Sequence, residues 1–132
     1  MKRKFTVSLV AVFVVGICAS GAFAQNPTRI KFRPGATSVI VKGSLNGYKS
    51  SRTYVVRVRA GQRLTTENAG DTNITIGVDA PRGSAYEQDM AADCHDRNEV
   101  TPTAAGDYKI TVTECQKADP FKGLFKFKLY VH

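Results

Sequence analysis

One short segment sets the architecture of this chain: Tyr54-Val55-Val56-Arg57-Val58-Arg59-Ala60-Gly61-Gln62. Successive side chains of a β-strand point to opposite faces, and one of the two sets is apolar here: Tyr54, Val56, Val58 and Ala60. The other set carries Arg57 and Arg59, and the many β-branched residues suit a half-buried pleated surface. We therefore expect the central strand of an antiparallel sheet, with one face in the core and the other in water.

Apolar alternation recurs along the rest of the chain. It predicts further strands at residues 29–32, 37–41, 62–67, 73–78, 107–114 and 124–131, with a turn-rich connection at 43–51 and an irregular segment at 84–100. No stretch has sustained helical periodicity. The fold class is therefore all-β: a single antiparallel two-sheet β-sandwich, jelly-roll-like, of about seven or eight short strands. The predicted core contains Tyr54, Val56, Val58, Ile110, Val112, Phe125, Phe127 and Leu129.

The first 24 residues have the three-part pattern of a secretory signal peptide. A positive start at residues 2–4 precedes an apolar run at 9–18, and Ala22-Phe23-Ala24 matches a cleavage site with a small residue on each side of a variable one. The apolar run is short for a membrane anchor, and Cys18 lacks the preceding residues that lipidation usually needs. We expect cleavage after Ala24, a mature domain at 25–132, and a periplasmic or secreted protein without a membrane span.

Two cysteines remain in the expected mature chain, Cys94 and Cys115. An even pair in an exported protein is typical of a disulfide, and only one pairing is possible. The alternatives are two free thiols or a metal site, but His95 is the only other soft ligand nearby and a structural zinc site needs four ligands. We expect a Cys94–Cys115 disulfide, no metal and no cofactor.

The mature chain lacks the sequence patterns of catalysis. Its two histidines are His95 and the last residue, His132, and it contains no Gly-x-Ser-x-Gly, no His-Glu-x-x-His and no Gly-rich phosphate loop. Hydrolysis needs an activated nucleophile, a pair of carboxylates or a metal ion. We therefore expect no enzymatic activity.

Charge is unevenly distributed along the chain. Without residues 2–4, the 19 basic residues become 16 against 11 acidic residues, a net charge of +5, which suits anionic envelope surfaces better than nucleic acid. Segment 79–99 nevertheless contains six acidic residues: Asp79, Glu87, Asp89, Asp93, Asp96 and Glu99. This segment is either a solvated loop or a recognition loop tethered by Cys94. A calcium site formed by its last four acidic residues is a further interpretation, although their spacing matches no calcium-loop pattern.

A second charge feature is a set of cations that face outward from the predicted strands: Arg57, Arg59, Lys126 and Lys128. We expect these side chains to form one basic stripe on the sandwich. Their other possible role is to protect strands against pairing with a second chain at an exposed edge.

Several framework segments resemble a set of small exported bacterial β-sandwich proteins. The resemblance rests on Gly47-Tyr48, Tyr54-Val55-Val56, Ala60-Gly61-Gln62 and the segments 30–35, 105–110 and 127–131. The set includes the periplasmic inhibitors of goose-type lysozyme and, more distantly, pre-peptidase C-terminal domains. Lysozyme inhibitors of several families carry Ser-Gly-x-x-Tyr on a loop that enters the lysozyme cleft. Here residues 82–86 have the Gly and the Tyr at that spacing, with Arg82 in place of the Ser.

The resemblance implies a non-catalytic binding protein of the lysozyme-inhibitor type, whose partner is a lysozyme or another exported protein. The expected contact surface is the loop at 82–99, with Tyr86 as its anchor. The expected partner-binding residues are Arg82, Gly83, Ser84, Tyr86 and Glu87. The alternative is a carbohydrate- or cell-envelope-binding accessory module that uses Tyr48, Tyr86 or the basic stripe to hold an envelope glycan. A purely structural envelope protein is a third hypothesis, and none of the three involves nucleic acid.

Overall fold

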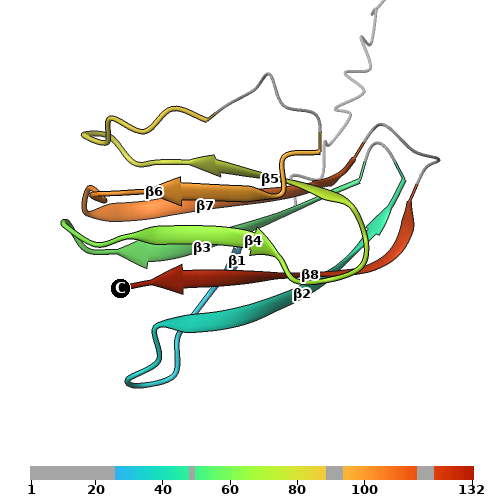
Figure 1. The fold of residues 1–132 in the computed structure, drawn as a ribbon, viewed down its shortest axis with the longest axis horizontal. Coiled ribbons are helices and arrows are strands. Elements are labelled where there is room, and N and C mark those ends of the chain that lie inside the picture. The colour runs from blue at the N-terminus through green and yellow to red at the C-terminus, as the bar shows by residue number, and fades with distance from the viewer. Residues whose placement is uncertain (1–25, 48–49, 89–93, 116–120) are drawn as a thin grey trace, which may run out of the picture.

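The protein is a sandwich of two four-stranded sheets (Figure 1). The structure is a computed structural model that describes residues 26–47, 50–88, 94–115 and 121–132, so the expected signal peptide and its cleavage site lie outside it. We call the two sheets odd and even after their strands. The odd sheet has the order β1 (Thr28–Arg29), β3 (Ser51–Val58), β7 (Gly106–Glu114), β5 (Ile74–Asp79). The even sheet has the order β2 (Ser38–Asn46), β8 (Lys122–Val131), β4 (Leu64–Asn68), β6 (Arg97–Val100).

The chain changes sheet at every connection, because consecutive strands always lie in different sheets. All pairs of neighbouring strands are antiparallel except β1 and β3, which pair in parallel through Thr28 and Arg29. The predicted all-β two-sheet sandwich is therefore confirmed, with eight strands in the described ranges. No part of those ranges folds into a helix of the length and apolarity that a bilayer span requires.

The core lies between the inner faces of the two sheets, and all eight residues predicted for it are buried. The ring of Tyr54 from β3 meets the ring of Phe127 from β8 edge to face, with 5.6 Å between their centroids. This contact joins the odd sheet to the even sheet at the centre of the molecule. Burial raises the pKa of the Tyr54 hydroxyl, which lies 3.5 Å from the carbonyl oxygen of Lys42 on β2.

The segment 54–62 does provide an inner strand, because β3 lies between β1 and β7. The expectation for Ala60 is wrong, since β3 ends at Val58 and Ala60 is exposed in the following turn. That turn bonds to another part of the chain: the amide of Gly61 donates to the carbonyl of Thr103 at 2.9 Å. The alternation of inward apolar side chains therefore ends at Val58, before the turn begins.

The turn-rich connection expected at 43–51 is also wrong in part, because β2 continues through it to Asn46. Gly43 lies inside the strand, and a Cβ atom there would be 2.5 Å from both the hydroxyl oxygen of Tyr54 and Cζ of Phe125. Glycine is thus needed for close packing at this position, not for a turn. Tyr48, the other aromatic of this segment, lies outside the described residues.

A strand that was not predicted, β6, lies in the irregular segment 84–100. Its residues alternate in burial: Asn98 and Val100 are buried, whereas Arg97 and Glu99 are exposed. A search for alternating apolar residues does not detect this strand, because one of its two inward residues is an asparagine. The consequence is a polar side chain inside the sandwich, at the side where β5 and β6 are the edge strands.

Phe127→Ala tests the register of β8. Phe127 has no exposed surface, so its truncation should reduce the free energy of unfolding by about 3–5 kcal/mol. Lys128→Ala, the next residue, should cost less than about 1 kcal/mol, although its ammonium lies 4.5 Å from the ring centroid of Tyr130. The measurement is the urea midpoint at constant slope, and equal shifts for the two variants would contradict the register.

Candidate protein-binding site

A hollow of about 390 Å³ lies between two connections of the sandwich. One wall is the segment that follows β5, and the other is the end of β6 with the connection to β7. In Figure 1 both segments lie toward the left end of the molecule, the end at which the β6 arrow points. The lining residues are Gly83, Ser84, Ala85, Tyr86, Glu99, Val100, Thr101, Pro102, Thr103 and Ala104. We call this hollow the groove.

The first wall begins with a tight turn at residues 81–84. The amide of Ser84 donates to the carbonyl of Pro81 at 3.2 Å, and the amide of Tyr86 donates to Oγ of Ser84 at 3.2 Å. Gly83 has a φ of +90°, a region that side chains with a Cβ rarely adopt, and nothing lies within 4 Å of the place where a Cβ would be. The backbone at Gly83 is therefore open to the approach of another molecule.

Tyr86 is half-buried and packs its ring against the core, so it points into the protein. Its hydroxyl lies 3.1 Å from Oε1 of Gln88 and 3.1 Å from Oδ1 of Asn98 and can donate to either. Gln88 Oε1 also accepts the amide of Val78 on the edge strand β5 at 2.8 Å. The polar tip of Tyr86 is thus engaged inside the protein, and only the rest of the side chain can line the groove.

Asn98 connects the two sheets beneath this wall. Its amide nitrogen donates to the carbonyl of Ile76 on β5 at 2.7 Å and to Oγ1 of Thr66 on β4 at 3.1 Å, while its amide oxygen is 3.1 Å from the Tyr86 hydroxyl. Asn98 is only 3% exposed, so water cannot replace these bonds. The position of Tyr86 therefore depends on a buried amide contributed by β6.

The second wall is held by its own hydrogen bonds. Thr103 is buried, its hydroxyl donates to the carbonyl of Arg59 at 2.6 Å, and the same hydroxyl accepts the amide of Gln62 at 2.9 Å. The hydroxyl of Tyr108 is within 3.1 Å of both the amide and the carbonyl of Ala104. Both walls are therefore fixed before any partner arrives, which reduces the entropy lost on binding.

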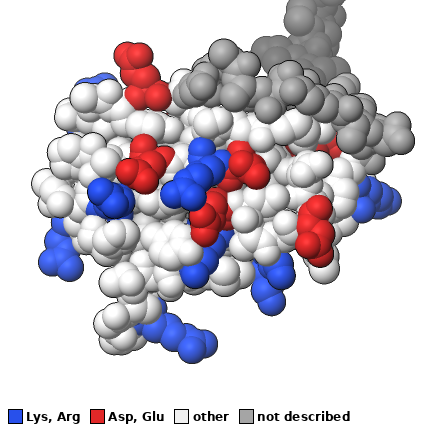
Figure 2. All heavy atoms as spheres, viewed as in Figure 1, with Lys and Arg blue, Asp and Glu red and all other residues white. Residues whose placement is uncertain are grey.

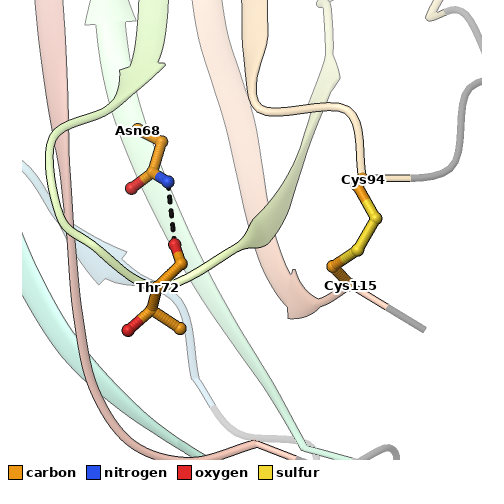
Figure 3. The surroundings of a disulfide bond; sticks show 4 residues. All are labelled: Asn68, Thr72, Cys94 and Cys115. Carbon is orange, nitrogen blue, oxygen red and sulfur yellow. Dashed lines mark hydrogen bonds between the residues drawn. A yellow bond between two sulfur atoms is a disulfide. The ribbon is translucent and has the colours of Figure 1, made fainter. Parts of the chain in front are cut away.

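The Cys94–Cys115 disulfide anchors the other end of the first connection, and its prediction is confirmed (Figure 3). The two Cα atoms are 4.6 Å apart; Cys115 directly follows β7, and Cys94 lies shortly before β6. Directly after Cys94, the carbonyl of His95 accepts a hydrogen bond of 2.6 Å from the amide of Ile76 on β5. The bond therefore ties the start of β6 to the end of β7.

The structure brings some of the predicted partner-binding residues together and leaves others at the rim. Gly83, Ser84 and Tyr86 line the groove, whereas Arg82 and Glu87 are exposed beside it. The sequence does not predict the second wall, residues 99–104, because their Thr-Pro-Thr pattern indicates a turn but not what the turn packs beside.

The acidic cluster is only partly described. Asp89 and Asp93 lie outside the described residues, Asp96 is exposed, and Glu99 lies 3.8 Å from Arg63. The described residues contain no group of three or more His, Cys, Asp or Glu side chains placed to hold a metal ion.

The predicted basic stripe is wrong, because its members lie on opposite faces of the sandwich. Arg57 projects from the odd sheet, whereas Lys126 and Lys128 project from the even sheet. Arg57 is 3.7 Å from Asp107, whose carboxylate also accepts two hydrogen bonds of 3.2 Å from Arg29. The hydrogen bonds from Arg29 are the main cause of a lowered pKa at Asp107. On the face turned to the viewer, formed by the even sheet, acidic and basic groups stand close together over β4 and β6 (Figure 2).

Solved structures include close matches to this fold. PliG of Aeromonas hydrophila, a periplasmic inhibitor of g-type lysozyme, is 26% identical with a TM-score of 0.62, and the match covers 80% of this chain and 96% of PliG. PliG of Salmonella Typhimurium is 18% identical with a TM-score of 0.57 and coverages of 80% and 97%. The chain resembles the PliG lysozyme inhibitors. The resemblance predicted from the framework segments is thereby confirmed.

A third match is more distant. The pre-peptidase C-terminal domain of collagenase from Bacillus anthracis is 18% identical with a TM-score of 0.49, and the match covers 81% of this chain and 95% of that domain. This fit is too loose to carry an argument about function. No family model and no curated protein matches the sequence.

Asn98→Ala tests whether the buried amide supports the groove. The substitution leaves the Ile76 carbonyl and other buried groups without their partner, so the free energy of unfolding should fall by about 3 kcal/mol. Arg97→Ala is the matched control: its side chain is exposed, with a single ion pair to Glu67, and its loss should cost less than about 1 kcal/mol. Urea unfolding of both variants measures the difference. An equal urea midpoint for the two variants would show that the buried hydrogen bonds of Asn98 do not stabilise the fold.

Removal of the disulfide tests the tether. A double Cys94→Ala and Cys115→Ala variant should lose about 3 kcal/mol in the chain-entropy model, because the bond closes a loop with a sequence separation of 21. Reductant should lower the urea midpoint of the wild type and leave the double variant unchanged. Two titratable thiols in the native exported protein would contradict the bond.

Proposed function

We propose that the protein is an exported, non-catalytic binding protein of the lysozyme-inhibitor type. In this proposal the signal peptide is cleaved after Ala24, and the mature chain binds a lysozyme through the groove. The observation that carries the proposal is the likeness to Aeromonas hydrophila PliG, an inhibitor of g-type lysozyme, at 26% identity over 96% of that chain. The preformed groove, whose first wall contains three of the five residues expected to bind, supports the same conclusion.

The proposed contact uses the exposed parts of the first wall. Gly83 allows the partner to approach the backbone, and Arg82 and Glu87 provide polar contacts at the rim. Tyr86 contributes the exposed part of its half-buried side chain, while its hydroxyl keeps the loop attached to Asn98. This role differs from the expected anchor whose polar tip enters the partner, because the tip is already hydrogen-bonded inside the protein.

Charged side chains near the groove set the expected electrostatics. Glu87 and Arg82 are both exposed at the rim, and Glu99 lines the second wall 3.8 Å from Arg63, so the site presents charges of both signs and attracts a partner with complementary charges. Such attraction speeds association and weakens as salt is added. The alternative, an envelope-glycan module, has less support now that the basic stripe is divided between two faces.

The test is an inhibition assay with purified c-, g- and i-type lysozymes. The mature protein at micromolar concentration should inhibit at least one of them, and its affinity should fall with increasing salt. Glu87→Ala and Arg82→Ala should each weaken inhibition by roughly five- to thirtyfold, the range of a polar interface contact. The fold should remain intact because both side chains are exposed.

Asp71→Ala is the matched control for Glu87→Ala, since Asp71 is an equally exposed carboxylate in the β4–β5 connection and away from the groove. It should inhibit as the wild type does. Peptidoglycan sedimentation is run beside the inhibition assay. If all three lysozymes keep full activity and the protein sediments with peptidoglycan, the inhibitor proposal fails and the envelope module replaces it.

A further inference from the structure

A second surface of the molecule has a composition that the groove does not explain. Among the described residues, the large apolar side chains left exposed are Ile40, at 44%, and Leu124, at 79%. Both lie on strands of the even sheet, on the pair β2 and β8, which run side by side in Figure 1. In the register of this pair, Ile40 is opposite Lys128 and Leu124 is opposite Ser44. Since the residues of opposite parity face the core, Ile40 and Leu124 share the outer face.

Lysines occupy the same face between the two apolar residues. Lys42 and Lys126 are directly opposite each other in the register, and both are exposed. Like charges in directly opposed positions destabilise a sheet, so this pair costs the fold free energy. No ion pair in the described ranges involves Lys42, Lys122 or Lys126. Basic groups lie along the lower edge of Figure 2, with an acidic group near them at the lower right. We call Ile40, Lys42, Lys122, Leu124 and Lys126 the lysine–apolar patch.

The patch is built on an ordered frame with a hollow of about 390 Å³, which is lined by Lys42, Leu124 and Lys126 and also by the exposed Asp71. The β4–β5 connection lies against the stem of Lys126: a Cβ on Gly70 would be 3.3 Å from its Cγ, and the amide of Ala69 donates to its carbonyl at 3.1 Å. Asn68 closes that connection by donating to the carbonyl of Thr72 at 2.8 Å, as Figure 3 shows. The stem of Lys126 is therefore held in place.

We propose that the lysine–apolar patch docks the protein on an anionic lipid membrane. Clustered lysines attract the negative surface of such a membrane, at roughly 1 kcal/mol for each lysine near it. Exposed apolar side chains among the lysines enter the boundary between headgroups and acyl chains. Without a membrane, these side chains would remain in water. The patch presents both features on one face, and the mature chain adds a net charge of +5.

The same observations disfavour other occupants. A polyanion such as an acidic glycan would pair with Lys42 and Lys126 but would leave Leu124, at 79% exposed, in water. A second copy of this chain, docked face to face, would place lysines against lysines. A membrane is the partner that satisfies the charge and the apolar side chains together.

Docking there is compatible with the proposed function but independent of it. β2 and β6 are opposite edges of the even sheet, the patch is on the β2 side, and the groove is on the β6 side. A protein held on a membrane by the patch would therefore leave the groove accessible to a soluble partner.

The experiment is co-sedimentation of the mature, oxidised protein with vesicles of phosphatidylethanolamine and phosphatidylglycerol. The same experiment with phosphatidylcholine in place of phosphatidylglycerol gives the neutral reference. The wild type should bind the anionic vesicles, bind them less as salt is added, and leave the neutral vesicles unbound. Absence of binding to the anionic vesicles, or equal binding to both kinds, overturns the proposal.

Two double variants separate charge from apolar insertion. Lys42→Gln with Lys126→Gln should weaken binding roughly thirtyfold, from the attraction expected of two lysines. The urea midpoint of this variant should not fall, because the opposed charges are removed. Arg57→Gln with Lys109→Gln, on the outer face of the odd sheet, removes the same charge and should bind nearly as the wild type does. An equal loss in both double variants would show a net-charge effect without a patch.

Apolar insertion has its own test at constant charge. Ile40→Ser with Leu124→Ser should weaken binding about tenfold, the loss expected from removing two modest apolar contacts. Binding equal to the wild type would make the contact purely electrostatic and end the proposal. The chain contains no tryptophan, so Leu124→Trp adds a single reporter whose emission should shift to the blue on anionic vesicles. Thr111→Trp on β7 is the control that should not shift, and an unshifted Leu124→Trp also ends the proposal.

Discussion

The constraint on which this structure depends is that the chain changes sheet at every connection. No strand can pair with its neighbour in sequence, so each ladder of hydrogen bonds joins segments distant in the chain, as β2 with β8 and β3 with β7. The register of such a ladder cannot come from a tight turn. It comes from the apolar faces, because a slip of one residue would turn every inward side chain to water. The contact of Tyr54 with Phe127 lies at the centre of this arrangement.

A sandwich of this kind has two open sides, and the polar groups that close them also build the candidate site. On the side of β2, Nε of Arg52 donates to the carbonyl of Ser44 at 2.9 Å. On the side of β5 and β6, the edge strand β5 has backbone groups that would otherwise lack partners, and Gln88, His95 and Asn98 supply them. Two of the residues that protect this edge, Gln88 and Asn98, also hydrogen-bond to Tyr86 in the groove wall. The binding site is thus inseparable from the closure of the sheet.

The surface charges follow the same division between sides. Near the groove, Glu99 is paired with Arg63 at the surface, whereas the face of β2 and β8 is dominated by lysines that have no acidic partner in the described ranges. A chain with a modest net charge can therefore carry mixed charges at one place and an unpaired basic cluster at another. Neither place needs a catalytic group, which agrees with the non-catalytic binding role proposed for the protein.

Local pattern alone was enough to predict the strand faces and the core, because the alternation of side chains has a period of two and needs no distant information. The disulfide also followed, since two cysteines allow one pairing. Local pattern could not reveal β6, where a buried Asn98 replaces the apolar residue that marks a strand. It placed Arg57 and Lys126 together, because parity tells which residues of one strand share a face but not which sheet the strand enters. The groove required the tertiary structure for the same reason: its two walls are separate in sequence, and the hydrogen bonds of Asn98 on β6 with Tyr86 and with Ile76 on β5 hold them together.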